Sequence, residues 1–400
     1  MSKENGLSKY RFVILLAIVP SIISTEMMWL TLAPISSIAE QYYGVSSLSI
    51  AMFSMSYMIM YILFSIPASW TVDKLGYRFS LIVGVLITAV FGFARFIYAD
   101  NFTIVLIAQF IIAIGQPFLL NISTKVPANW FPISERATAG GILTMAQYIG
   151  FAVPMLLAPM IADQSSIKDV FLVFAIIASV SAVIAIIFTK EKPAVAPPGP
   201  TAPKEEISVK AMVKLIKNKT FLLVLCICFI SIGIFNTLLT LLETILLPRG
   251  ITSSQAGVIG TVFVLAGIIG AVVLPIISDT LHKRTIFFVG NVALLIPIYL
   301  AFTFVPNYLL LNILAGAAGF LTMGVAPILF QHGTEVAYPL PEGSSLGVIL
   351  LMGQISGALF VYLFDLMQGV SGPVVPMVCI VVLTIIELPV ALKMQESKLT

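Results

Sequence analysis

Twelve long apolar segments constrain this chain more than any other feature. A helix that crosses a bilayer needs about 20 mostly apolar residues. Only 10% of the residues are charged, against about 25% in soluble proteins. The segments do not alternate polar and apolar residues, as the strands of a membrane barrel would. We therefore predict an all-α membrane protein with twelve spanning helices. They lie at roughly 11–36, 49–72, 79–99, 102–124, 136–161, 168–189, 219–247, 254–278, 284–304, 307–331, 344–369 and 371–393.

A polar segment separates the first six apolar segments from the last six. Residues 190–218 are rich in proline, lysine and glutamate, which is typical of an extended, solvated linker. We expect a six-helix bundle at 1–189, this cytoplasmic linker at 190–218, and a second six-helix bundle at 219–400. Residues 208–219 combine lysines with apolar residues. They form either an amphipathic helix on an anionic membrane face or a solvated basic linker.

The placement of basic residues predicts the orientation in the membrane. With both termini in the cytoplasm, all but three of the 21 lysines and arginines lie on the inner side. The exceptions, at or near the outer face, are Arg95, Lys168 and Arg249. Because cytoplasmic loops of membrane proteins carry an excess of basic residues, we predict a multi-pass protein of the cell membrane, plasma or inner, with both termini inside.

The two halves carry related sequences. The stretch Glu135 to Gly150 aligns without gaps on Glu342 to Gly357, and the alignment pairs Gln147 with Gln354. A charged turn, Asp73-Lys-Leu-Gly76-Tyr-Arg78, is echoed by Asp279-Thr-Leu-His282-Lys-Arg284 between later apolar segments. Two parallel copies of six helices, joined by a cytoplasmic linker, indicate the major facilitator architecture.

The charged turns suggest a cytoplasmic gate. Their acids and bases can pair with groups on neighbouring helices in one conformational state and separate in another. Alternatively, these residues are only topology anchors. The residues that we assign to the gate are Asp73, Gly76, Arg78, Asp279, Arg284, Glu135 and Glu342.

Polar side chains at membrane depth suggest a binding site. They are costly in lipid and usually face a cavity or the bundle interior. We assign substrate binding to Trp29, Gln147, Asn236 and Gln354, and a coupling or charge-partner role to Glu26 and Glu243. The glutamines either bind substrate or join helices. Glu26 and Trp29 share a helix face and form either a cation site or a proton site.

The sequence offers no cofactor or metal chemistry. Cys226, Cys228 and Cys379 lie in apolar segments and are expected to be small core residues. The two histidines, His282 and His332, map to cytoplasmic ends, and no nucleotide-binding or metal-ligand motif is present. We therefore expect no enzyme activity, no cofactor and no nucleic-acid partner, and we expect energy to come from gradients.

Three motifs resemble one family within the major facilitator superfamily. They are Pro67-Ala68-Ser-Trp70-Thr-Val-Asp73-Lys-Leu-Gly76-Tyr-Arg78, Trp130-Phe131 with the stretch ending in Gln147, and Glu335-Val-Ala-Tyr338-Pro339-Leu-Pro-Glu342-Gly343-Ser-Ser345-Leu-Gly347 ending in Gln354. These are similar to the feline leukaemia virus subgroup C receptor-related transporters, which are linked to choline, ethanolamine and haem.

The resemblance implies roles for particular residues. Trp29 matches the family's aromatic residue for a quaternary ammonium group, and Gln147 and Gln354 match its glutamines. The family's aromatic residue on helix 7 is replaced by Asn236, and its nearby asparagine by Glu243. No histidine lies at cavity depth to ligate haem iron.

We predict a monomeric transporter of a small polar or cationic organic solute, with a choline-like amine favoured, that works by alternating access in the lipid bilayer. One alternative is a proton-coupled exporter of amphipathic compounds. Another is a membrane receptor or sensor of the same fold that binds ligand without transport.

Overall fold

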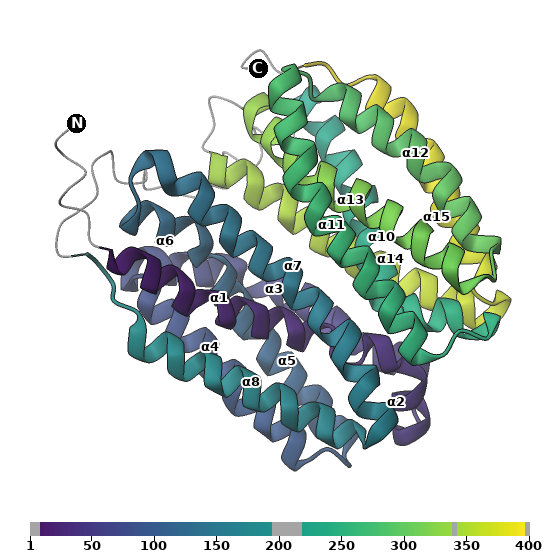
Figure 1. The fold of residues 1–400 in the computed structure, drawn as a ribbon, viewed down its shortest axis with the longest axis horizontal. Helices are drawn as coiled ribbons and strands as arrows, with labels where there is room; N and C mark the ends of the chain where they lie inside the picture. The colour runs from purple at the N-terminus through teal and green to yellow at the C-terminus, as the bar shows by residue number, and fades with distance from the viewer. Residues whose placement is uncertain (1–8, 194–217, 338–341, 397–400) are drawn as a thin grey trace. The chain divides into compact units, whose positions relative to one another are not determined.

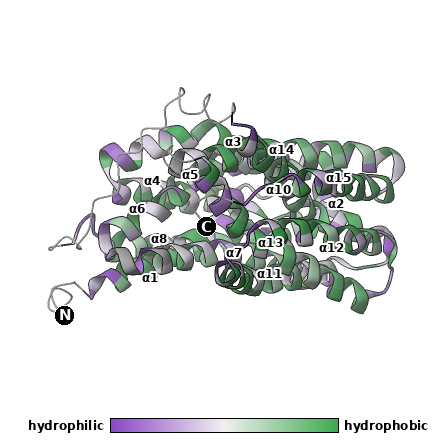
Figure 2. Ribbon diagram, turned by 90° about the horizontal axis from the view of Figure 1, so that it is seen from above, coloured by the Kyte–Doolittle hydropathy of each residue, from purple (hydrophilic) through white to green (hydrophobic). Residues whose placement is uncertain are grey.

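A computed structural model describes residues 9–193, 218–337 and 342–396 (Figure 1). Within these ranges, 12 helices are long and apolar enough to cross a membrane, which confirms the predicted all-α fold. Apolar residues cover most of the helical surface, and polar residues gather towards helix ends and loops (Figure 2). The predicted helix at 208–219 begins in residues outside the described part of the chain.

Within the described residues, the first half contains eight α-helices and one short 3-10 helix. They are α1 (Tyr10–Trp29), η2 (Ala33–Ile35), α2 (Ser36–Tyr43), α3 (Ser47–Leu75), α4 (Tyr77–Ile97), α5 (Phe102–Leu120), α6 (Ile122–Trp130), α7 (Ile133–Gln164) and α8 (Ile167–Phe188). The second half contains α10 (Lys219–Leu246), η3 (Leu247–Arg249), α11 (Ser253–Leu281), α12 (Thr285–Phe304), α13 (Tyr308–Val336), α14 (Glu342–Ser371) and α15 (Val374–Leu392).

The contacts divide the chain into two compact units. Unit 1 contains Met1–Leu32, Gln41–Gly44 and Met52–Lys204, and unit 2 contains Ala33–Glu40, Val45–Ala51 and Glu205–Thr400. The second part of the first membrane span therefore belongs with the C-terminal helices, where η2 packs on α10 and α11.

The first span is not one continuous helix, as the apolar segment 11–36 had suggested. α1 ends at Trp29, and Leu30, Thr31 and Leu32 are not helical before η2 begins. The hydroxyl of Thr31 donates to the carbonyl oxygens of Met28 (3.0 Å) and Met27 (3.3 Å). This bond caps carbonyl groups that the broken helix leaves free.

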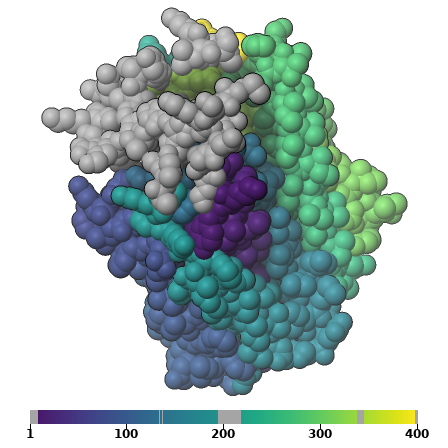
Figure 3. All heavy atoms as spheres, turned by 60° about the vertical axis from the view of Figure 1, so that its left-hand side comes forward, coloured from purple at the N-terminus to yellow at the C-terminus, as the bar shows by residue number. Residues whose placement is uncertain are grey.

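In unit 1, α1 lies against α7 and α8, and α4 packs on α5 and α8. The start of α1, in purple, lies beside the end of α8, in teal, where the Tyr10 hydroxyl donates to the Phe188 carbonyl oxygen at 2.9 Å (Figure 3). Ile14, Ile18 and Ile22 of α1 are fully buried. α1 is thus a central helix of its unit, which explains why a carboxylate on it is enclosed by protein.

In unit 2, α11 packs along α13 over an extensive contact, and α10 packs on α14. Glycines let these helices approach. A Cβ on Gly319 would overlap the Phe263 carbonyl oxygen, and one on Gly270 would overlap the Phe320 carbonyl oxygen. Small residues at such crossings are the usual means of close packing between membrane helices.

Candidate functional site

Trp29 closes α1 and is held in a fixed orientation. Its indole N–H donates to the Ser54 carbonyl oxygen on α3 at 3.0 Å. Its ring meets Phe151 of α7 edge to face, with centroids 5.2 Å apart, and Phe151 is 6.0 Å from the Tyr148 ring. With its polar atom already bonded, Trp29 offers a ligand only ring surface, which suits a cationic group.

Glu26 lies one helical turn before Trp29 and is 1% exposed. Both of its carboxylate oxygens are 3.1 Å from the amide nitrogen of Gln116 on α5. Gly150 of α7 passes so close that a Cβ there would be 2.6 Å from the Glu26 Cβ. No lysine, arginine or histidine among the described residues forms an ion pair with Glu26. A buried carboxylate in this state needs a cation or a proton.

Arg95, expected at or near the outer face, is fully buried in unit 1. Its guanidinium donates to the Gln109 Oε1 at 2.6 Å and to the Thr31 hydroxyl at 3.4 Å, and lies 5.1 Å from the Phe171 ring centroid. The Gln109 amide nitrogen donates in turn to the Met28 carbonyl oxygen at 3.1 Å. These bonds hold the break in the first span, and no motif in the sequence indicated that Arg95 is buried among the helices.

The two repeat-related glutamines are placed alike. Gln147 on α7 of unit 1 and Gln354 on α14 of unit 2 are each partly buried. In the described part of the chain, no hydrogen bond is formed by either side chain, so both amides are free for a ligand. Asn236 differs, because its amide nitrogen donates to the Gly353 carbonyl oxygen at 3.5 Å and so links α10 to α14.

Glu243 lies near the end of α10 in unit 2, and its carboxylate accepts three hydrogen bonds. Its carboxylate accepts from the Ser253 hydroxyl at 2.8 Å, from the Ser37 backbone N–H at 3.2 Å and from the Ser37 hydroxyl. Ser37 lies in α2 and Ser253 in α11, so the Glu243 carboxylate hydrogen-bonds α10 to both of these helices. In the same unit, the Ser47 hydroxyl at the start of α3 donates to the Asp365 carboxylate of α14 at 2.6 Å.

One end of unit 1, predicted to face the cytoplasm, carries the first charged turn. Asp73 pairs with Lys125 at 2.6 Å, and Glu135 pairs with Arg11 at 3.0 Å. Arg78 does not pair with Asp73 among the described contacts; its guanidinium donates to the Ile186 carbonyl oxygen at 3.3 Å.

Gly76 in this turn has a conformational and a steric reason to be glycine. It has φ 91°, in the region that favours glycine. A Cβ there would also be 2.5 Å from the Glu191 carboxylate. Glu191 accepts from the backbone N–H of Tyr77 at 3.2 Å and of Arg78 at 2.8 Å, and so caps α4.

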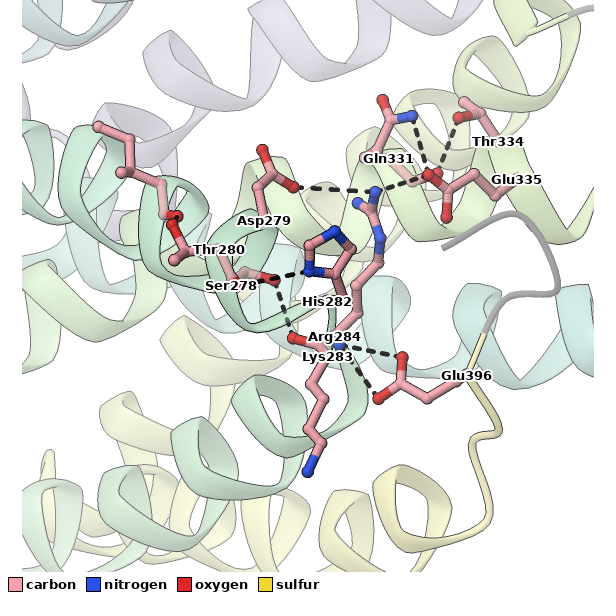
Figure 4. A network of polar contacts seen from close by, with 11 residues as sticks. Ser278, Asp279, Thr280, His282, Lys283, Arg284, Gln331, Thr334, Glu335 and Glu396 are labelled. Carbon is pink, nitrogen blue, oxygen red and sulfur yellow. Dashed lines mark hydrogen bonds and ion pairs between the residues drawn. The ribbon is translucent and has the colours of Figure 1, made fainter.

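The second charged turn, in unit 2, also forms ion pairs with neighbouring residues, but the paired residues differ from those of unit 1. Arg284 binds Glu335 of α13 at 2.6 Å and reaches Asp279 at 4.0 Å, so the three side chains lie in a row (Figure 4). Glu396 accepts from the backbone N–H of Arg284 at 3.0 Å (Figure 4). It also accepts from the backbone N–H of Thr285 at 2.9 Å. His282 takes the place of Gly76 with φ 53°.

Glu191 and Glu396 were missed in the sequence because they lie in polar tails. Each follows the last helix of its half at nearly the same repeat spacing, and that spacing is the signal that could have identified them. The side chain of Glu342, the remaining predicted gate residue, lies outside the described residues. No group of three histidine, cysteine, aspartate or glutamate residues in the described ranges could hold a metal ion.

Comparisons with known proteins agree with the fold and the motifs. Residues 15–361 match the family model of the Major Facilitator Superfamily. The choline/ethanolamine transporter flvcr2b of Danio rerio is 29% identical over 89% of this chain and 78% of its own length. The choline/ethanolamine transporter FLVCR2 of Homo sapiens is 28% identical over 88% and 71%. Solute carrier family 49 member A3 of Danio rerio is 30% identical over 88% and 76%.

Solved structures show the same architecture. A bacterial homologue of the human lysosomal transporter Spinster superposes with a TM-score of 0.78 at 17% sequence identity. The match covers 96% of this chain and 97% of that structure. At this identity the likeness is one of fold.

Proposed function

The chain belongs to the Major Facilitator Superfamily, and from that membership we propose that it carries a small polar or cationic organic solute across the cell membrane by alternating access. A choline-like amine is favoured, because similar proteins are named as choline/ethanolamine transporters. Both termini lie in the cytoplasm in this proposal, and the monomer is the working unit.

One observation carries the choice of a cation. Glu26 is buried, has no basic partner in the described chain, and lies one helical turn from the Trp29 ring. A carboxylate beside an aromatic face binds an ammonium group by charge and by cation–π attraction. In unit 1, the free amide of Gln147 is suited to the hydroxyl end of such a solute. In unit 2, Gln354 offers an amide of the same kind, next to Gly353, which Asn236 bonds.

The same observation also favours a second candidate function. A proton can neutralise Glu26 as well as an ammonium group can, which makes a proton-coupled exporter of amphipathic compounds the alternative. Glu243 is the other candidate proton carrier, although its three hydrogen bonds in unit 2 make it the more constrained group.

Thermal unfolding of the purified protein in detergent tests the proposal. Choline, ethanolamine, other amines, anions and haem would be added singly to the wild type and to Trp29→Ala. A ligand at about 100 times its dissociation constant stabilises by roughly 2.7 kcal/mol. We expect choline-like amines to raise the unfolding temperature of the wild type and not that of Trp29→Ala.

Trp70→Ala is the matched control, because Trp70 on α3 is 57% exposed and lies outside the proposed site. This variant should keep the full amine response. If no amine shifts the wild type at millimolar concentration, the amine proposal fails and the proton-coupled exporter becomes the better account. Stabilisation by anions or haem alone would equally contradict it.

A further inference from the structure

We propose that the N-terminal unit selects amines that carry N–H groups over quaternary amines, through a pair of acceptors formed by Glu26 and Gln116. The inference rests on the proposed function and specifies its substrate. It assigns to Gln116 and to the tyrosines of α3 a part in recognition that neither their sequence positions nor the repeat suggested.

The acceptor pair joins α1 and α5. The Gln116 amide nitrogen is shared between the two Glu26 oxygens, at 3.1 Å from each. The Oε1 of Gln116 is buried and has no hydrogen-bond partner among the described residues. Two kinds of acceptor, a carboxylate and an amide oxygen, therefore lie side by side with too few donors.

Other buried carboxylates of the membrane helices are satisfied differently. Glu243 accepts from two serine hydroxyls and a backbone N–H, and Glu387 on α15 accepts from the Ser231 hydroxyl at 2.5 Å. Only an amide donor reaches Glu26 within the described ranges. Glu387, like Glu26, has a single donor group within the described ranges, so what distinguishes the Glu26 position is the unpaired Gln116 Oε1 beside the carboxylate.

Buried aromatic residues belong to the same unit as the acceptor pair. Tyr57 and Tyr61 lie one turn apart on α3 and are almost fully buried. Trp29 lies one turn along α1, and its N–H is already used by Ser54. The aromatic rings attract any ammonium group. The carboxylate and amide oxygens form hydrogen bonds only with ammonium groups that carry N–H donors.

The number of N–H groups decides how well an amine fits. A primary ammonium has three donors, enough for the carboxylate and for the Gln116 Oε1 together. A quaternary ammonium has none, and it would leave these buried acceptors unpaired, which is costly. Both kinds carry the same net charge, so a difference between them is not explained by net charge, and the Gln116 variant tests the part due to hydrogen bonding.

A methylation series measures this difference directly. Dissociation constants for ethanolamine, N-methylethanolamine, N,N-dimethylethanolamine and choline would be determined by calorimetry on the purified full chain. We expect affinity to fall as N–H groups are lost, with ethanolamine bound about ten- to a hundredfold more tightly than choline. Gln116→Met should reduce this ratio by weakening ethanolamine binding more than choline binding.

Glu387→Gln is the matched control, since it also neutralises a buried membrane carboxylate but should leave the ratio unchanged. Choline binding as tight as ethanolamine binding would overturn the selectivity and leave the proposed function standing. An unchanged ratio in a folded Gln116→Met would remove Gln116 from recognition. If none of the four amines binds, the proposed function itself fails. The wild-type series decides the selectivity even where a variant does not fold.

Discussion

A single carboxylate caps the N-terminus of one helix in each half. Glu191 accepts from backbone N–H groups at the start of α4, and Glu396 does so at the start of α12. The first turn of a helix has free N–H groups and a positive dipole end, which favour a carboxylate. Each cap thus ties the chain that follows one helix bundle to the charged turn of the same bundle.

Glu396 should make stability depend on acid pH. Burial alone would raise its pKa, but hydrogen bonds from the Thr285 hydroxyl and from the backbone of Arg284 and Thr285 hold the pKa below the ordinary 4.5. The ionised form is therefore stabilised in the folded state. Its contribution is present above pH 4.5 and is lost as the pH falls through the lowered pKa of the folded state.

Thermal unfolding of the wild type and Glu396→Gln at a series of pH values checks this. The wild type should unfold at the higher temperature at neutral pH, and the gap should close as the pH falls below the lowered pKa of Glu396, where both side chains are neutral. A gap that stays constant over the whole range would show that Glu396 acts by shape and not by charge.

Helix packing in unit 2 depends on backbone contact at glycines. Gly319 on α13 faces the Phe263 carbonyl oxygen of α11, and a Cβ there would overlap it. Gly316, one turn earlier on the same helix, has the Val262 side chain as its nearest neighbour, at 3.4 Å from a Cβ. The two positions share a helix and a residue type but differ in the space available.

Gly319→Ala should therefore destabilise unit 2 by about 1–3 kcal/mol, the usual cost of forcing extra atoms into a close-packed interface. Gly316→Ala should change stability little, because a side chain can adjust more easily than a backbone carbonyl. Chemical or thermal unfolding in detergent measures both. Equal stability of the two variants would contradict the close approach of α11 and α13.

At the scale of the whole molecule, the first membrane span is divided between the two units. Its first part, α1, belongs to unit 1, while Ala33–Glu40 belongs to unit 2. There Ser37 hydrogen-bonds to Glu243, which also accepts from Ser253. The division falls next to the non-helical residues Leu30 to Leu32, which Arg95 and Gln109 hold from unit 1. Alternating access requires segments that change partners, and a span broken at this point is suited to do so.

A cross-link tests whether this fastening must open. The hydroxyl oxygens of Ser37 and Ser253 are 3.5 Å apart, so Ser37→Cys with Ser253→Cys should form a disulfide under oxidation. We expect the oxidised protein in proteoliposomes to lose most amine transport and to regain it on reduction.

Oxidised wild type controls for the native cysteines. The pair Thr252→Cys with Gln255→Cys controls for a disulfide at the start of α11, where the two residues cap the same helix. Full transport by the oxidised Ser37/Ser253 variant would mean that α2 stays on unit 2 throughout the cycle.

Local sequence was enough to predict the fold and the family. Twelve apolar segments, a polar linker and a repeated charged turn are properties of neighbouring residues, and membrane helices satisfy their own backbone hydrogen bonds. The same reasoning brought Glu26 next to Trp29, because residues three apart share a helix face. It also paired Gln147 with Gln354, because the repeat relates their positions.

Contacts between helices could not be predicted in this way. Hydropathy shows that a residue lies in a span, but not which neighbour its side chain meets, because that depends on the rotation and approach of whole helices. The tertiary structure therefore decided three contacts. Glu26 accepts from Gln116, Arg95 donates to Gln109 inside unit 1, and Glu243 accepts from Ser37 of α2. The sequence by itself determined which helices form and which polar groups enter the membrane, and packing determined which of those groups are left without a partner.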